Sequence, residues 1–97
     1  MGYKLELQQQ AIVEIQDAYD WYETQRLGLG DELMEEIEDA LAAISEDPER
    51  YGYVKTNSLY RRIRVSRFPY MVVYEVEGNV VIVNSVVHFK RDKKFDS

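Results

Sequence analysis

The spacing of the apolar residues changes once along this chain of 97 residues, and that change constrains the fold more than any other feature. Between Gln9 and Pro48, apolar residues recur every three or four positions, which is the period of amphipathic helices. After Tyr51 they alternate with polar residues, which is the period of β-strands. Residues 3–7 alternate as well and predict a short strand before the helices. The chain should therefore be of the α+β class.

Two helices are predicted in the first half, separated by a break at Gly28-Leu29-Gly30. The apolar stripe of the first helix is formed by Ile12, Ile15, Tyr19 and Tyr22, with Ala11 and Ala18 alongside. The apolar stripe of the second is formed by Leu33, Ile37, Leu41 and Ile44. The second helix should end before Pro48, because a proline disfavours helical geometry in the residue before it. Since the connection is short, the two helices are expected to form an antiparallel hairpin.

Three strands are predicted in the second half. Arg62 and Arg64 share one side of the first strand, while Ile63 and Val65 share the other. The next strands cover residues 70–76 and 80–87, and residues 77–79 between them are typical of a tight hairpin. The predicted order is β-α-α-β-β-β, with an N-terminal helical hairpin packed on a mostly antiparallel four-stranded sheet. Residues 1–97 are expected to form a single domain.

The formal charge changes sign near the middle of the chain. The first fifty residues carry 14 acidic and 3 basic side chains, whereas the remainder carries 9 basic and 4 acidic ones. Guanidinium groups on one strand face can bind phosphates or carboxylates, so the basic half is where an anionic partner is expected. The alternative is a solvated strand face that pairs with the acidic helices. The candidate partner-binding residues are Arg61, Arg62, Arg64, Arg67, Lys90 and Arg91, with Lys93 and Lys94 in the same tail.

Several function classes are excluded or disfavoured by composition. The chain has no cysteine, which excludes a disulfide scaffold and a thiolate zinc site. It has no apolar run of the length of a signal peptide or membrane span, so a cytoplasmic protein is expected. No glycine-rich phosphate loop is present, and neither a metal nor a cofactor is predicted. The single histidine, His88, could be a general base toward an RNA 2′-hydroxyl or a structural residue at a strand end.

Four short motifs, in order, resemble those of the RelE/ParE toxin family. Residues 21–25, Trp-Tyr-Glu-Thr-Gln, precede the glycine break, and residues 47–51, Asp-Pro-Glu-Arg-Tyr, lie at the helix-to-sheet connection. Residues 67–70, Arg-Phe-Pro-Tyr, with Tyr74 resemble the central strand of that family, and His88 with Arg91 resembles its C-terminal motif. The resemblance runs over nearly the whole chain. It implies the toxin of a type II toxin–antitoxin pair of the plasmid-stabilisation kind, held inactive by a cognate antitoxin.

The resemblance implies two activities between which the residues discriminate. RelE-like members cut mRNA on the ribosome; Arg62, Arg64, Arg91 and His88 would be the catalytic candidates here. ParE-like members inhibit DNA gyrase without nuclease chemistry. The nucleases tend to carry an arginine where this chain has Met71 and a C-terminal tyrosine where its last aromatic residue is Phe95. The ParE-like branch is therefore favoured.

Three hypotheses follow from the sequence. The first is a gyrase-binding toxin neutralised by an antitoxin. The second is a ribosome-dependent endoribonuclease, and the third is an attenuated, non-enzymatic binding module. In each, a cognate antitoxin-like segment is the expected protein partner, and no membrane is involved. The sequence leaves a homodimer open.

Overall fold

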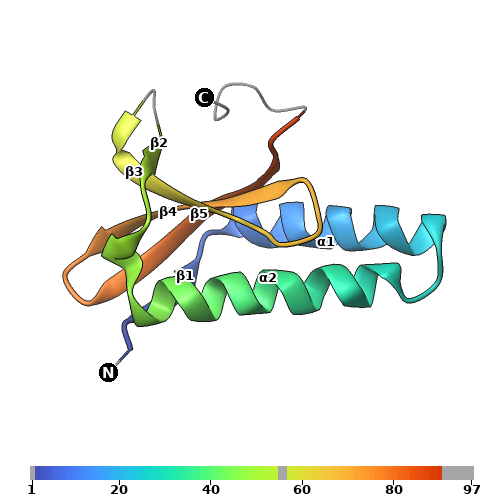
Figure 1. Cartoon of the computed structure of the whole chain (residues 1–97), viewed down its shortest axis with the longest axis horizontal. Coiled ribbons are helices and arrows are strands. Elements are labelled where there is room, and N and C mark those ends of the chain that lie inside the picture. The colour runs from blue at the N-terminus through green and yellow to red at the C-terminus, as the bar shows by residue number, and fades with distance from the viewer. Residues whose placement is uncertain (1, 55–56, 91–97) are drawn as a thin grey trace.

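The computed structural model describes residues 2–54 and 57–90. Its elements follow one another as β1 (Lys4–Leu7), α1 (Gln9–Gln25), α2 (Leu29–Glu46), a short 3₁₀ helix η1 (Pro48–Arg50), β2 (Tyr53–Val54), β3 (Asn57–Arg64), β4 (Tyr70–Glu77) and β5 (Val80–His88). Figure 1 shows α1 and α2 side by side along one side of the sheet. The chain belongs to the α+β class, as predicted.

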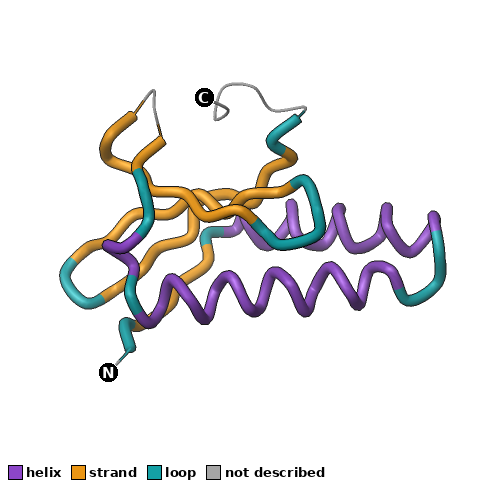
Figure 2. The backbone as a smooth tube through the Cα atoms, viewed as in Figure 1, coloured by secondary structure: helices purple, strands orange, loops and turns teal. Residues whose placement is uncertain are grey.

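The described strands form one mixed sheet in the order β1-β5-β4-β3-β2. β1 runs parallel to β5, and every other neighbouring pair is antiparallel. The structure thus has a fifth strand beyond the four predicted, because β2 is only two residues long and too short to show a period. The tube in Figure 2 shows the strands, in orange, lying together beside the two helices, in purple.

The main core lies between the sheet and the helices. α1 contributes Ala11, Ile15 and Ala18 to this core, where they pack with strand residues such as Val72 and Val83. The two small alanines let α1 approach the sheet closely, so the buried line of α1 runs through them. Ile12 was predicted on the buried stripe, and this was wrong: its side chain is 46% exposed. Leu33, Ile37 and Ile44 of α2 are fully buried, as their spacing predicts.

A β-bulge shifts the register between β4 and β5. Tyr74 lies opposite Val83 and Val73 lies opposite Ser85, so Asn84 is an extra residue on β5. The bulge changes which residues face the helices: Val83 and Val86, three positions apart, both enter the main core. After the bulge, β5 continues to His88. The predicted tight hairpin between β4 and β5 is confirmed, with Gly78 at a φ of +59°.

No helix in the described part of the chain is both long and apolar enough to cross a membrane.

Candidate functional site

Arg62 and Arg64 lie on the face of the sheet opposite the helices. Arg62 is opposite Val73 on β4, and Arg64 is opposite Met71. Met71 and Val73 belong to a second, smaller cluster that is separate from the main core. We call this side the open face; its residues include Val54, Tyr60, Arg62, Arg64, Met71, Val73, Val87 and Phe89. The two arginines predicted to share a strand side therefore do so, above an apolar floor.

The guanidinium groups of the open face differ in what they contact. The Cζ atom of Arg64 lies 4.2 Å from the centre of the Phe89 ring, a cation–π contact that holds the side chain over an aromatic surface. The Nε atom of Arg62 is buried and has no hydrogen-bond partner among the described residues. A buried donor without a partner costs about 1–3 kcal/mol.

His88 lies on the other side of the sheet from these arginines. It is opposite Tyr70, whose side chain packs in the main core, and the two rings meet edge to face with centroids 5.2 Å apart. Its neighbours across a pocket of about 430 Å³ include Glu14, Asp17 and Trp21 of α1. The structure consequently separates His88 from Arg62 and Arg64, with which the sequence grouped it as a nuclease candidate.

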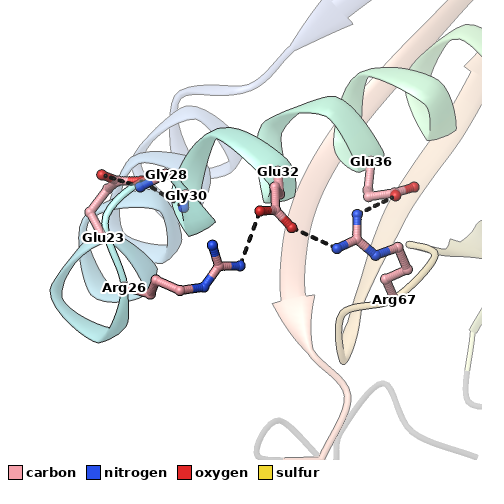
Figure 3. A network of polar contacts seen from close by, with 7 residues as sticks. All are labelled: Glu23, Arg26, Gly28, Gly30, Glu32, Glu36 and Arg67. Carbon is pink, nitrogen blue, oxygen red and sulfur yellow. Dashed lines mark hydrogen bonds and ion pairs between the residues drawn. The ribbon is translucent and has the colours of Figure 1, made fainter.

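Arg67 is held by the helices and not by the open face (Figure 3). It lies in the β3–β4 loop with a φ of +71°, and its guanidinium binds Glu32 at 2.6 Å and Glu36 at 3.2 Å. Glu32 also pairs with Arg26 at 3.0 Å. For Arg67, the alternative of pairing with the acidic helices is what the structure shows. We call Arg26, Glu32, Glu36 and Arg67 the arginine clamp; it ties the loop before β4 to α2.

The arginine clamp shifts the pKa values of its own groups. Hydrogen bonds from Arg67 and then from Arg26 lower the pKa of Glu32, while the bonds to Glu32 and Glu36 raise the pKa of Arg67. These side chains are accessible to solvent, so the interaction is screened and modest.

Replacing Glu32 by Gln is expected to lower the free energy of unfolding at neutral pH. Because the pKa of the folded carboxyl is lowered, its contribution is present above the ordinary value of 4.5 and is lost as the pH falls through the folded value. The difference from wild type should thus vanish in acid. Urea unfolding across this range measures it, with Glu35→Gln as control, because Glu35 has no ion pair in the described ranges. A difference that persisted in acid, or an equal effect of Glu35→Gln, would contradict the clamp.

Glu23 caps the start of the second helix (Figure 3). The N-cap residue of α2 is Gly28, which has no side chain to accept a hydrogen bond from the first turn. The Glu23 carboxylate accepts instead, from the backbone N–H of Gly28 at 3.1 Å and of Gly30 at 2.7 Å. The sequence analysis placed Glu23 within the motif of residues 21–25 and gave it no capping role. A signal was present, since an uncapped glycine turn needs an acceptor from nearby.

The remaining candidates occupy different surroundings. Arg61 donates to the carbonyl of Glu49 at 3.2 Å and to the Tyr53 hydroxyl at 2.9 Å. These hydrogen bonds connect β3 to η1 and to β2. Lys90 is exposed, and its backbone N–H donates to Nδ1 of His88. Arg91, with Lys93, Lys94 and Phe95, lies outside the described residues. Among residues 2–54 and 57–90, no cluster of three acidic or histidine side chains could hold a metal ion.

Comparison with known proteins identifies the family. A family model described as the ParE toxin of the type II toxin–antitoxin system parDE matches residues 5–93. The chain belongs to the ParE toxin family. This family contains the toxins of type II toxin–antitoxin pairs, which confirms the resemblance found in the sequence. A comparison with curated proteins finds no match.

Solved structures share the fold of this ParE-family chain. A chain of the chromosomal ParDE system from P. aeruginosa superimposes with a TM-score of 0.80 at 14% identity, over 89% of this chain and 95% of that one. An arginine-substituted variant of the E. coli toxin RelE in its free state gives a TM-score of 0.70 at 23% identity, over 96% and 90%. At these identities the likeness concerns the fold alone. The helical hairpin on a mixed sheet is thus a RelE/ParE-like fold.

Proposed function

We propose that this chain is a ParE-like toxin that inhibits DNA gyrase by binding it and is neutralised by a cognate antitoxin of the ParD type. The observation that carries the proposal is the separation of His88 from Arg62 and Arg64 on opposite faces of the sheet. Cleavage at an RNA 2′-hydroxyl needs a base and charge stabilisation on the same side of the substrate. Met71 lies directly opposite Arg64, where the nuclease branch tends to carry an arginine. Binding without chemistry fits this arrangement better.

The open face is the proposed partner surface. Arg62 has a guanidinium whose buried Nε atom finds no hydrogen-bond partner among residues 2–54 and 57–90, and Arg64 has a guanidinium over Phe89; both lie on an apolar floor. A floor of this kind with charged donors suits an acidic and partly apolar protein surface. Lys90 and Arg91 remain proposed members of the surface. The toxin and its antitoxin would act in the cytoplasm, where gyrase and DNA are found.

Purified toxin is expected to inhibit supercoiling of relaxed plasmid by DNA gyrase, and equimolar antitoxin should restore it. The antitoxin to be tested is the product of the neighbouring reading frame. Arg62→Ala combined with Arg64→Ala should weaken inhibition by about tenfold or more if the open face makes the contact. Supercoiling that stays unaffected while induction of the toxin still arrests growth would exclude gyrase as the target.

The second candidate is a ribosome-dependent endoribonuclease. It is favoured by one observation, the two neighbouring guanidinium groups of Arg62 and Arg64 on an accessible sheet face. Toeprinting of a translated mRNA decides between the two, because cleavage would give new stops that disappear in the double arginine variant. Harmless overproduction of a folded chain would instead favour a non-enzymatic binding module.

A further inference from the structure

The pocket of about 430 Å³ that contains His88 lies between α1 and the end of β5. It forms because β1 ends at Leu7, opposite Val83, so that no described strand pairs with the outer edge of β5 beyond this point. α1 lies along this edge instead, and the small side chain of Ala18 leaves space there. We call this the aromatic pocket, and its lining is Glu14, Asp17, Ala18, Trp21, Tyr70, Val86, Val87 and His88.

Two carboxylates line the aromatic pocket, and neither has a cationic partner in the described part of the chain. Glu14 is partly buried and accepts hydrogen bonds only from neutral donors, the Val86 N–H at 2.8 Å and the Gln10 amide at 3.1 Å. Asp17, one turn further along α1, is exposed and has no hydrogen bond or ion pair with residues 2–54 and 57–90. The helix that carries both contains no lysine or arginine. The pocket therefore holds negative charge that no described side chain offsets.

The backbone of β5 adds a hydrogen-bond acceptor to the same side. The N–H and C=O of one strand residue point to one side, and those of the next residue point to the other. The N–H of Phe89 points to β4, where it donates to Pro69, whereas the N–H of Val86 points to Glu14 on α1. The carbonyl of Val86 therefore faces α1 as well. The polar groups that face the pocket from α1 and from Val86 are thus mainly acceptors.

Aromatic rings form the other wall. Trp21 is 52% exposed, and its ring meets Tyr22 edge to face with centroids 4.9 Å apart. Tyr22 meets Tyr70 at 6.1 Å and Tyr70 meets His88 at 5.2 Å, so the four rings form one connected series. Nδ1 of His88 accepts the Lys90 N–H, and a nitrogen that accepts carries no proton, so the imidazole adds no positive charge. Aromatic rings beside carboxylates attract cations.

We propose that the aromatic pocket binds a small molecule that carries a guanidinium group. A guanidinium is flat, stacks on aromatic rings such as that of Trp21 and donates several N–H groups in one plane. The Asp17 carboxylate accepts two parallel hydrogen bonds from it, and the Val86 carbonyl accepts another. An anionic ligand would meet like charge instead. The volume suits a small ligand, and the site uses neither Arg62 nor Arg64 and does not depend on gyrase being the target.

Butylguanidinium and butylurea test the proposal, because they have nearly the same shape and only the first is charged. Trp21 is the only tryptophan in the sequence, so intrinsic fluorescence reports on the pocket directly. Butylguanidinium should change this fluorescence with a Kd of about 1 mM or below, and butylurea should bind at least about tenfold more weakly. Amide chemical shifts should change mainly at the lining residues. Equal binding of the two compounds, or no saturation by butylguanidinium, would overturn the proposal.

Matched variants locate the site. Asp17→Asn should weaken the binding of butylguanidinium by about 3–5-fold. Asp39→Asn removes the same charge from an exposed position of α2 outside the pocket and should leave the binding unchanged. Trp21→Leu should weaken it as well, followed by chemical shifts because the fluorophore is lost. Circular dichroism checks that each variant folds. Equal losses at Asp17 and Asp39 would mean general attraction to an acidic surface and would contradict a defined site.

The source of the guanidinium is tested with the tripeptide acetyl-Gly-Arg-Gly amide. The tripeptide should bind no more tightly than butylguanidinium, because the pocket is expected to contact the guanidinium and a short alkyl chain only. If the tripeptide bound at least about tenfold more tightly, the ligand would be an arginine of a protein and the assignment to a small molecule would be wrong.

Discussion

Ile44→Ala is expected to lower the free energy of unfolding by about 2–5 kcal/mol. Ile44 is fully buried in the main core, where α2 meets the sheet. Removing its outer carbons leaves a cavity that rigid neighbours fill only partly, and the lost contacts add to the lost hydrophobic transfer. A domain of this size is stable by about 5–15 kcal/mol, so one substitution removes a large part of the total.

The control is Ile12→Ala, the same chemical change on the other helix. The Ile12 side chain is 46% exposed, so its loss should cost less than about 1 kcal/mol. Urea unfolding measures the free energy of unfolding of both variants. The slope of this free energy against urea concentration should be the same as in the wild type. If the two variants lost the same stability, the burial described for α1 and α2 would be incorrect.

The contrast between these isoleucines shows what periodicity predicts and where it fails. Helical spacing identified both helices, and in α2 it also identified Leu33, Ile37 and Ile44 as buried, whereas Leu41 of the same predicted stripe is only partly buried. In α1 the stripe was displaced, because Ala11 and Ala18 are small enough to let the helix rest closely on the sheet. A hydropathy pattern gives large apolar residues more weight than alanine. It therefore cannot show which neighbouring line of a helix makes the closer approach.

The sheet was predicted in its elements but not in its pairing. The antiparallel β4–β5 hairpin followed from a local turn, whereas the parallel β1–β5 pair joins residues more than seventy positions apart. The bulge at Asn84 depends on packing on both faces of β5 and leaves no local mark. Long-range register of this kind is set by tertiary contacts that a single sequence does not display.

In the candidate site, too, local features could be predicted and long-range contacts could not. That Arg62 and Arg64 share a face followed from the two-residue period of a strand. The placement of His88 on the other face could not be predicted. The bulge four residues earlier adds one residue to β5, and this extra residue decides on which face of the sheet His88 lies. The pairing of Arg67 with Glu32 and Glu36 likewise joins a loop to a helix over thirty residues away. The acidic first half and the basic second half of the chain indicated that such ion pairs could form. They did not indicate which arginine would form them.

Gly30→Ala is expected to destabilise the chain by about 1–3 kcal/mol, although alanine is the better helix former. A Cβ atom at this position would lie 2.8 Å from the backbone oxygen of Tyr19 and 2.8 Å from the Glu23 side chain. The helices would have to separate, and Glu23 would have to release the N–H groups that it caps. The clash and the lost cap together outweigh the gain in helix propensity.

Gly52→Ala is the matched control, because a Cβ there would meet nothing within 4 Å and its φ is not positive. This variant should be neutral or slightly more stable, since alanine restricts the unfolded chain. Thermal and urea unfolding of both variants give the comparison. In a domain of this size, each kcal/mol of lost stability lowers Tm by about 4–8 °C. Equal stability of Gly30→Ala and wild type would mean that α1 and α2 do not cross as closely as described.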